Sequence, residues 1–234
     1  MGSGVGAVMP TFNMGQYLVE AIESVVHQVD KLVIVDDAST DDTVDILLNR
    51  KEEVVKLAEN LGTAEAINYG IDRLRKLGDF KWLTWVSSDN VHYANWIKRE
   101  LEEDDGKTGA IYSGMDVRGS PGGFCRSSYS FRQYAPKFLG ESIQCHFGCS
   151  YLIRADVWRD HRGQFAHDYD NWLRVEEACW AKGLRIIGID EPLAMYRVHR
   201  GQRTREPRSD SKDAKLWLEE SKKRRMRMGI TPPS

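Results

Sequence analysis

The fold is decided by the stretch Val33-Ile34-Val35-Asp36-Asp37-Ala38-Ser39-Thr40-Asp41-Asp42-Thr43. A β-branched apolar run ends here in two carboxylates, and a turn of small residues and a helix start follow. In a parallel α/β sheet this order places Asp36 and Asp37 at the carboxyl edge of a strand, where ligands bind. Because burying carboxylates is costly, the pair indicates a polar ligand or a metal. A capping box formed by Ser39 and Asp42 is the alternative interpretation of the later residues, and it leaves the two preceding acids unexplained.

Apolar strands and amphipathic helices alternate along the first half of the chain, which predicts an α/β fold with a Rossmann-like, mostly parallel sheet and helices on both faces. The expected strands are Val5–Met9, Leu32–Val35, Val54–Leu57 and Trp82–Val86, and the expected helices are Tyr17–Val26, Thr43–Asn49 and Thr63–Leu77. For the second half we expect strands at Cys149–Arg154, Leu184–Ile189 and Ala194–Val198, and helices at Tyr169–Ala181 and Lys215–Met228. The stretch Val117–Ser130, rich in Gly, Ser and Arg, is expected to be a loop or hairpin.

Length and composition suit one α/β domain, or a domain with an appended tail, because the chain has 234 residues, 41% of them hydrophobic, and a net charge of -2. The spacing of the four cysteines does not suggest a disulfide scaffold. Since neither a signal peptide nor a membrane-spanning apolar run is recognised, we expect a cytoplasmic protein. The basic helix expected at Lys215–Met228 leaves three alternatives open, namely packing on its own domain, a link to further chain, or peripheral contact with anionic membrane lipids.

Polar residues follow three of the expected strands, at points that would meet along one edge of the sheet. They are Pro10-Thr11-Phe12-Asn13, Asp36-Asp37 and Ser87-Ser88-Asp89-Asn90. A fourth segment, Asn60–Gly70, opens a helix with small residues along one side, where a flat ligand can approach and the helix N-terminus favours phosphate. Close packing of this helix on the sheet is the alternative interpretation. Together with the polar strand ends, the segment predicts a nucleotide site.

Two common phosphate-binding loops do not occur in this sequence. It has no G-x-x-x-x-G-K-[ST] segment, and no G-x-G-x-x-G follows an expected strand. These observations argue against ATP hydrolysis by a P-loop and against NAD chemistry. The basic run near the C-terminus would raise nucleic-acid affinity only non-specifically, and no nucleic-acid-binding motif accompanies it, so we expect no specific nucleic-acid partner.

The motifs, in their order along the chain, resemble the family-2 glycosyltransferases of the GT-A fold. The resemblance is carried by Met9-Pro10-Thr11-Phe12-Asn13, Val35 to Thr43, Asn60-Leu61-Gly62, Gly148-Cys149-Ser150 with Arg154, His167 to Arg174, and Tyr196-Arg197-Val198-His199. It implies a GT-A domain over residues 1–200, with a nucleotide-binding half at 1–115 and an acceptor and catalytic half at 116–200. Residues 201–234 would form an Arg-rich loop and the C-terminal basic helix.

The resemblance implies transfer of a sugar, with inversion, from a nucleoside-diphosphate sugar to a hydroxyl of a glycan, lipid-linked or protein-linked acceptor in glycan or polysaccharide synthesis. UDP-sugars are the favoured donors. The implied nucleotide-binding residues are Pro10, Thr11, Asn13, Asp37, Asn60, Gly62, Ala66, Ser87, Ser88 and Asp89. Asp89 is the implied ligand of Mn²⁺ or Mg²⁺, since hard cations favour oxygen ligands, and His199 is implied as a further ligand or as a contact of the diphosphate. For His199 a purely structural role is the alternative.

Asp168 matches the acid that the resemblance implies as general base, which takes the proton from the acceptor hydroxyl. The alternative is an acidic first turn that stabilises the following helix through its dipole. Arg197, Arg203 and Arg205 are implied contacts of the diphosphate. For Arg203 and Arg205 a solvated linker is the alternative.

The sequence departs from the family pattern at two positions, and these departures keep other functions open. Ser87 stands in place of the first acid of the Asp-x-Asp motif, and His167 replaces the usual acid before Asp168. A catalytically weak or inactive nucleotide- or sugar-binding homologue is therefore one alternative. A sugar-phosphate nucleotidyltransferase is another, but it would need a Gly-rich loop carrying Lys or Arg after the first strand, which Pro10-Thr11-Phe12-Asn13 lacks.

Overall fold

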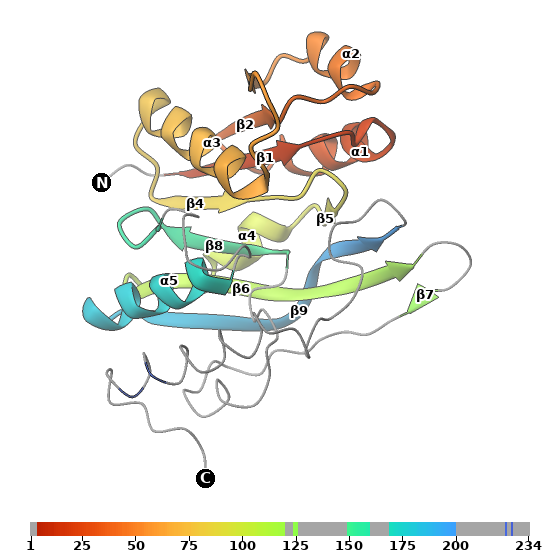
Figure 1. Ribbon diagram of the computed structural model, residues 1–234. Coiled ribbons are helices and arrows are strands. Elements are labelled where there is room, and N and C mark those ends of the chain that lie inside the picture. Colours follow the sequence, from red (N-terminus) through yellow and green to blue (C-terminus); the bar gives the residue numbers. More distant parts are fainter. Residues whose placement is uncertain are drawn as a thin grey trace.

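The computed structural model describes residues 4–119, 124–125, 149–159 and 169–199, together with Lys223 and Met226 (Figure 1). Apart from those two residues, the helix expected at Lys215–Met228 lies outside the described residues. The same holds for the expected Arg-rich loop.

Four parallel strands from the first half of the chain form one side of the sheet, in the order β3-β2-β1-β4. They are β1 (Val5–Thr11), β2 (Lys31–Asp36), β3 (Glu53–Lys56) and β4 (Trp82–Trp85). The connecting helices are α1 (Gly15–Val25), α2 (Thr43–Leu48) and α3 (Thr63–Leu77). All four strands and all three helices confirm the sequence prediction, with differences only at their ends.

Strand β1 is buried on both faces, as a central parallel strand must be. Successive side chains of a strand point to opposite faces. Ala7 and Met9 accordingly belong to the core that contains the apolar face of α1, whereas Val8 packs with the core beneath α3. Helices therefore cover both faces of the sheet (Figure 1).

The second half of the chain extends the sheet with strands of mixed direction, which the sequence did not indicate. Its elements are β5 (Val91–His92), α4 (Trp96–Leu101), β6 (Thr108–Gly119), β7 (Phe124–Cys125), β8 (Tyr151–Arg154), α5 (Tyr169–Ala181) and β9 (Arg185–Val198). Strand β8 is antiparallel to both β4 and β6, and β6 runs parallel to β9. The strands expected at Leu184–Ile189 and Ala194–Val198 are one continuous strand, β9, whose pairing with β6 shifts register near Gly114.

Helix α3 lies unusually close to the sheet at Gly70. A Cβ atom added there would lie 2.3 Å from Val8 Cγ1 and 2.9 Å from Val8 Cγ2, distances that real Cβ atoms essentially never show, and 3.0 Å from Val35 Cγ2. Ala66, one turn earlier on the same face, is fully buried. Close helix–sheet packing thus accounts for the small residues of α3 itself, and it holds the start of this helix beside the carboxyl ends of β1 and β2.

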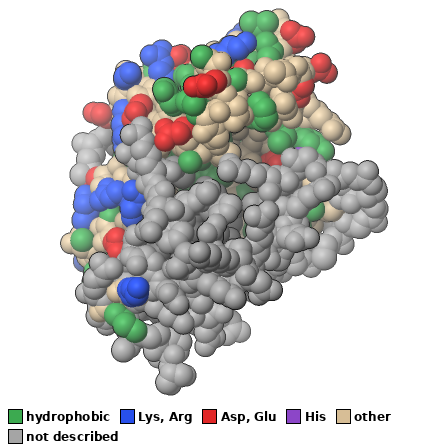
Figure 2. All heavy atoms as spheres, viewed as in Figure 1, with side chains coloured by type: hydrophobic (Ala, Val, Ile, Leu, Met, Phe, Trp, Pro, Cys, Tyr) green, Lys and Arg blue, Asp and Glu red, His purple; other side chains and the backbone are tan. Residues whose placement is uncertain are grey.

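Acidic and basic side chains lie interspersed over the described part of the surface seen in Figure 2. This arrangement agrees with the near-zero net charge of the chain. Among the described residues, none of the helices combines the length and apolar character that crossing a bilayer requires.

The carboxyl group of Glu100 on α4 is fully buried in the core of the second half. It accepts hydrogen bonds from Ser113 Oγ of β6 at 2.9 Å and from Ser150 Oγ, just before β8, at 3.2 Å. Burial raises the pKa of Glu100 to about 8, against the smaller lowering effect of these hydrogen bonds. The group is therefore mostly neutral at pH 7, and it ties α4 to the two strands beneath it.

We predict that Glu100 makes the stability of this chain fall as the pH rises. Because the folded pKa of about 8 exceeds the ordinary value of 4.5, the folded state binds the extra proton between these two pH values. The unfolding free energy of the wild type should fall, relative to that of Glu100→Gln, by up to about 1.4 kcal/mol per pH unit in that window. Urea denaturation at several pH values checks this. Glu102→Gln on the exposed side of the same segment is the control, and equal pH slopes for the wild type and Glu100→Gln would contradict the prediction.

Candidate active site

The polar strand ends predicted from the sequence meet at one edge of the sheet. Thr11 and Asp36 are paired partners at the ends of β1 and β2, and the Asp37 amide donates to the Thr11 carbonyl at 2.9 Å. On the other side of β1, the Val86 amide, just after β4, donates to Val8. The segment carrying Ser88 and Asp89 therefore begins at the same edge.

Side chains and backbone amides build the turn after β2 together with the turn after β1. Asp36 Oδ1 accepts from the Ser39 amide, Ser39 Oγ accepts from the Asn13 amide, and Asn13 Oδ1 accepts from the Thr40 amide, at 2.8 to 3.0 Å. Asn13 and Ala38 both have positive φ, of 54° and 63°. Such backbone strain is often found at functional sites.

The structure contradicts the alternative interpretation in which Ser39 and Asp42 form a capping box. Asp42 makes no capping hydrogen bond with its side chain, and Ser39 Oγ is used by Asn13. Asp41 instead accepts from the first amide of α2, that of Thr43, at 3.0 Å, and from the Gly15 amide at the start of α1 at 3.2 Å. One carboxylate thereby links the N-termini of two helices at this edge.

Asp37 fixes the loop that precedes α3. Its two carboxylate oxygens accept from the amides of Leu61 and Gly62, at 2.7 and 2.8 Å, and its carbonyl accepts from Asn60 Nδ2 at 3.2 Å. Gly62 has a φ of 87°, which favours glycine, and a Cβ there would meet nothing within 4 Å. These hydrogen bonds thus hold the loop Asn60–Gly62 against the strand edge, and the space next to Gly62 is open.

Asp89 and His199 form a buried pair at the same edge. His199 Nε2 donates to Asp89 Oδ2 at 3.0 Å, and the two residues are 8% and 6% exposed. Asp89 Oδ1 and Thr11 Oγ1 are buried without a hydrogen-bond partner among the described residues. Because buried polar atoms are normally satisfied, these two atoms suit contact with a polar ligand.

The pair also provides a test of whether a divalent cation fits. The unpartnered Asp89 Oδ1 is a suitable donor for Mn²⁺ or Mg²⁺. His199 Nε2 donates its proton to Asp89 Oδ2, so it would bind a cation only after losing that proton and that hydrogen bond. Within the described ranges no cluster of three or more His, Cys, Asp or Glu side chains comes together, so the remaining ligands would have to come from elsewhere. The residues present fit a cation that a diphosphate helps to hold.

Arg197 is engaged by neighbouring protein groups. Its Nε donates to the Asp89 carbonyl at 2.9 Å, its Nη2 pairs with Glu20 at 2.6 Å, and its amide donates to Asn90 Oδ1 at 3.0 Å. These bonds hold the segment Asp89-Asn90 against the end of β9. The predicted contact of Arg197 with a diphosphate remains a prediction.

The other predicted site residues differ in how far the structure describes them. Pro10 lies in buried β1, Ser88 is buried beside Asp89, Ser87 is half-buried, and the fully buried Ala66 serves helix–sheet packing. Asp168, Arg203 and Arg205 lie outside the described residues.

Two aromatic residues at this edge were missed as candidates. Phe12 is 41% exposed between Thr11 and Asn13, and an exposed ring at a nucleotide site can stack on a base. Tyr17 of α1 packs against His199, with ring centroids 4.7 Å apart. A large apolar ring left exposed next to Thr11 was the available signal for Phe12, whereas the contact of Tyr17 with His199 arises only from the tertiary fold.

We predict that Asp37→Ala lowers the unfolding free energy by about 2 kcal/mol, because two backbone amides lose a charged acceptor. Urea denaturation measures this change. Asp42→Ala, at an exposed position whose side chain makes no capping bond, is the matched control and should change stability by less than about 0.5 kcal/mol. Equal stability of the two variants would mean that Asp37 does not hold the loop.

Curated relatives and solved structures resemble this chain over most of its length. It is 27% identical over 220 residues to the uncharacterized glycosyltransferase RP339 of Rickettsia prowazekii, covering 86% of this chain and 65% of that relative. It is 27% identical over 214 residues to the putative teichuronic acid biosynthesis glycosyltransferase TuaG of Bacillus subtilis, covering 83% and 79%. S. aureus TarS, crystallised with UDP-GlcNAc, superposes with a TM-score of 0.61 at 19% identity, covering 85% of this chain and 59% of that one.

The likeness to TarS confirms the predicted GT-A fold class. The chain spans 65% of the length of its relative RP339. A sequence model described as glycosyl transferase family 2 matches residues 7–161, which is most of the chain. The chain therefore belongs to glycosyl transferase family 2.

Proposed function

We propose that this chain transfers a sugar from a nucleoside-diphosphate sugar to an acceptor hydroxyl, and that UDP is the nucleotide. The observation that carries the proposal is the buried Asp89–His199 pair at the carboxyl edge of the parallel strands. Leaving a buried polar atom unsatisfied costs about 1–3 kcal/mol. A polar ligand that contacts Asp89 Oδ1 and Thr11 Oγ1 would offset that cost.

The comparisons support the donor and the kind of product. TarS was solved with UDP-GlcNAc and with UDP, and the name of TuaG refers to teichuronic acid biosynthesis. We propose by extension a UDP-sugar donor and a role in glycan or polysaccharide synthesis, with a glycan, lipid-linked or protein-linked acceptor. Since the chain spans only part of its relative RP339, donor, acceptor and product are all parts of the proposal.

The first half of the chain would bind the nucleotide. Asp37 holds the loop Asn60–Gly62 in place, and the turn of Thr11 and Asn13 lies beside it. Pro10, Ser87 and Ser88 would complete the lining of this edge. The exposed Phe12 ring would stack on the base.

Asp89 and His199 would hold Mn²⁺ or Mg²⁺ together with the diphosphate. Such a cation, when bound, neutralises negative charge on the leaving diphosphate. The burial of Asp89 and His199 keeps water from competing for their polar atoms. Arg203 and Arg205 would add positive charge near the same phosphates.

Asp168 would act as the general base. In this proposal its carboxylate takes the proton of the acceptor hydroxyl while that oxygen attacks the anomeric carbon. Attack from the face opposite the nucleoside diphosphate inverts the configuration of the sugar. We propose that the reaction takes place in the cytoplasm, with the C-terminal basic residues available for peripheral contact with a membrane.

We predict that Asp168→Asn slows the hydrolysis of a UDP-sugar, in which water replaces the acceptor, by about 100-fold or more. Its affinity for UDP should stay within about twofold, because the base acts on the acceptor and not on the nucleotide. A coupled assay for released UDP across a panel of UDP-sugars gives the rates, and calorimetry gives the affinities. Asp170→Asn, two residues further on, is the control and should retain activity. An unchanged rate in Asp168→Asn would instead favour a nucleotide-binding homologue without this base.

A further inference from the structure

Helix α1 contacts both residues that flank Val198 at the end of β9. The Tyr17 ring lies 4.7 Å from the His199 ring, centroid to centroid, at an interplanar angle of 48°. The guanidinium carbon of Arg197 lies 4.9 Å from the centroid of the same Tyr17 ring. One half-buried aromatic side chain therefore packs against the imidazole and the guanidinium together.

Arg197 connects Tyr17 to Asp89, the second member of the Asp89–His199 pair. Its Nε donates to the Asp89 carbonyl at 2.9 Å, and its Nη2 pairs with Glu20 Oε2 at 2.6 Å. The Arg197 side chain is 18% exposed, whereas that of Glu20 is 57% exposed. A planar guanidinium held by two acceptors and an aromatic ring has little freedom to rotate, so the Asp89 backbone is held as well.

The N-terminus of α1 is anchored to the turn that would bind the nucleotide. The Met14 amide donates to Thr43 Oγ1 at 2.9 Å, and the Gly15 amide donates to Asp41 Oδ2 at 3.2 Å. One short helix therefore connects the turn after β2 with the Asp89–His199 pair.

We propose that Tyr17 and Glu20 are positioning residues for the Asp89–His199 pair, Tyr17 through the His199 ring and Glu20 through Arg197. This inference rests on the proposed function, in which the pair holds a divalent cation with the diphosphate. Tyr17 packs on the His199 ring and Glu20 pairs with Arg197, so each would act on the pair through another side chain. Removing a group that orients a metal ligand in this way commonly lowers the metal affinity about 10- to 100-fold.

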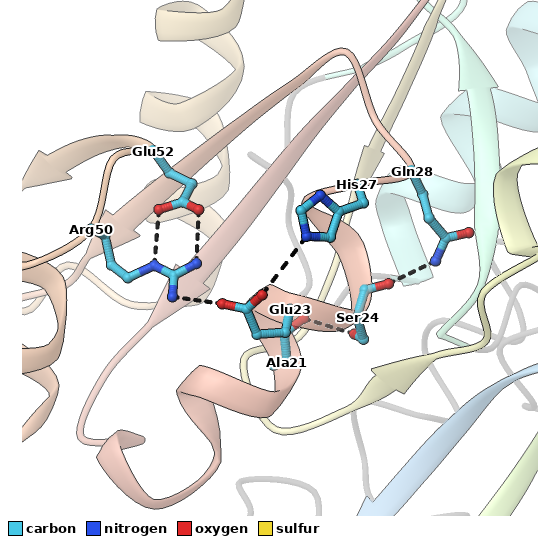
Figure 3. Close-up of polar contacts among 7 residues, drawn as sticks. All are labelled: Ala21, Glu23, Ser24, His27, Gln28, Arg50 and Glu52. Carbon is cyan, nitrogen blue, oxygen red and sulfur yellow. Dashed lines mark hydrogen bonds and ion pairs between the residues drawn. The ribbon is translucent and has the colours of Figure 1, made fainter.

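Glu23 offers a matched control on the same helix. Its side chain is 51% exposed, close to the value for Glu20, and it pairs with Arg50 Nη1 at 2.7 Å. Figure 3 shows Arg50 between Glu23 and Glu52, with His27 on the other side of Glu23. Glu23 thus forms the same kind of ion pair as Glu20, but with Arg50 between α2 and β3 and not with Arg197.

The test is the Mn²⁺ affinity of the chain in the presence of UDP, measured from the electron paramagnetic resonance signal of free Mn²⁺. Tyr17→Leu should weaken Mn²⁺ binding about tenfold, at the low end for groups that orient metal ligands. Glu20→Gln should weaken it about threefold, the scale of one partly screened ion pair. Tyr17→Phe, which retains the ring, and Glu23→Gln should both match the wild type. Circular dichroism melting curves check that every variant is folded.

Three other results would each contradict either the positioning role of Tyr17 and Glu20 or the proposed function. Wild-type affinity in both Tyr17→Leu and Glu20→Gln overturns the positioning role while leaving the proposed function intact. An increase in UDP affinity in Glu20→Gln without Mn²⁺ also overturns it, because Arg197 would then be released to bind the diphosphate. A wild-type chain that binds UDP equally with and without Mn²⁺ overturns the proposed metal-dependent function itself.

Discussion

A single buried hydrogen bond joins Asp89 and His199, which lie 110 positions apart in the chain. One partner follows β4, in the parallel half of the sheet, and the other follows β9, in the mixed half. Burying a carboxylate and an imidazole is favourable only when each has a partner, so the two strand ends must meet correctly for either to be tolerated. The pairing of β9 with β5 and the hydrogen bonds of Arg197 to Asp89 and Asn90 hold the end of β9 beside Asp89.

The first half of the fold could be predicted because its signals are local. The run Val33–Val35 is apolar, β-branched and followed at once by acids, and such a pattern has few alternatives to a buried parallel strand. Strand β6 and helix α4 were missed for a different reason. In the sequence, Glu100 lies among acidic residues, a pattern typical of a solvated surface. Its side chain is nevertheless fully buried, while that of Glu102 is exposed. The serines of β6 and of the segment before β8 hydrogen-bond to the buried carboxyl group, and they are distant in sequence.

The same distinction between local and distant signals applies to the candidate site. That Thr11, Asp37 and Asp89 lie at one edge follows from strand order and could be expected from the sequence. The contacts that each side chain makes there could not be expected from the sequence. Both carboxylate oxygens of Asp37 bind the loop before α3, so this acid shapes the edge as well as lying on it. Arg197, which is predicted to contact a diphosphate, also binds Glu20 and the Asp89 backbone, and these contacts could not be expected from the sequence.

The location of the cation tests the account most directly. A crystal structure of the chain with UDP and Mn²⁺, recorded at the manganese absorption edge, would give an anomalous peak at the metal. We expect that peak within coordination distance of the Asp89 carboxylate and the UDP diphosphate, beside the His199 ring, with the uracil at the edge formed by Thr11, Phe12 and the loop held by Asp37. UDP bound elsewhere, or a manganese peak away from both Asp89 and His199, would contradict the account.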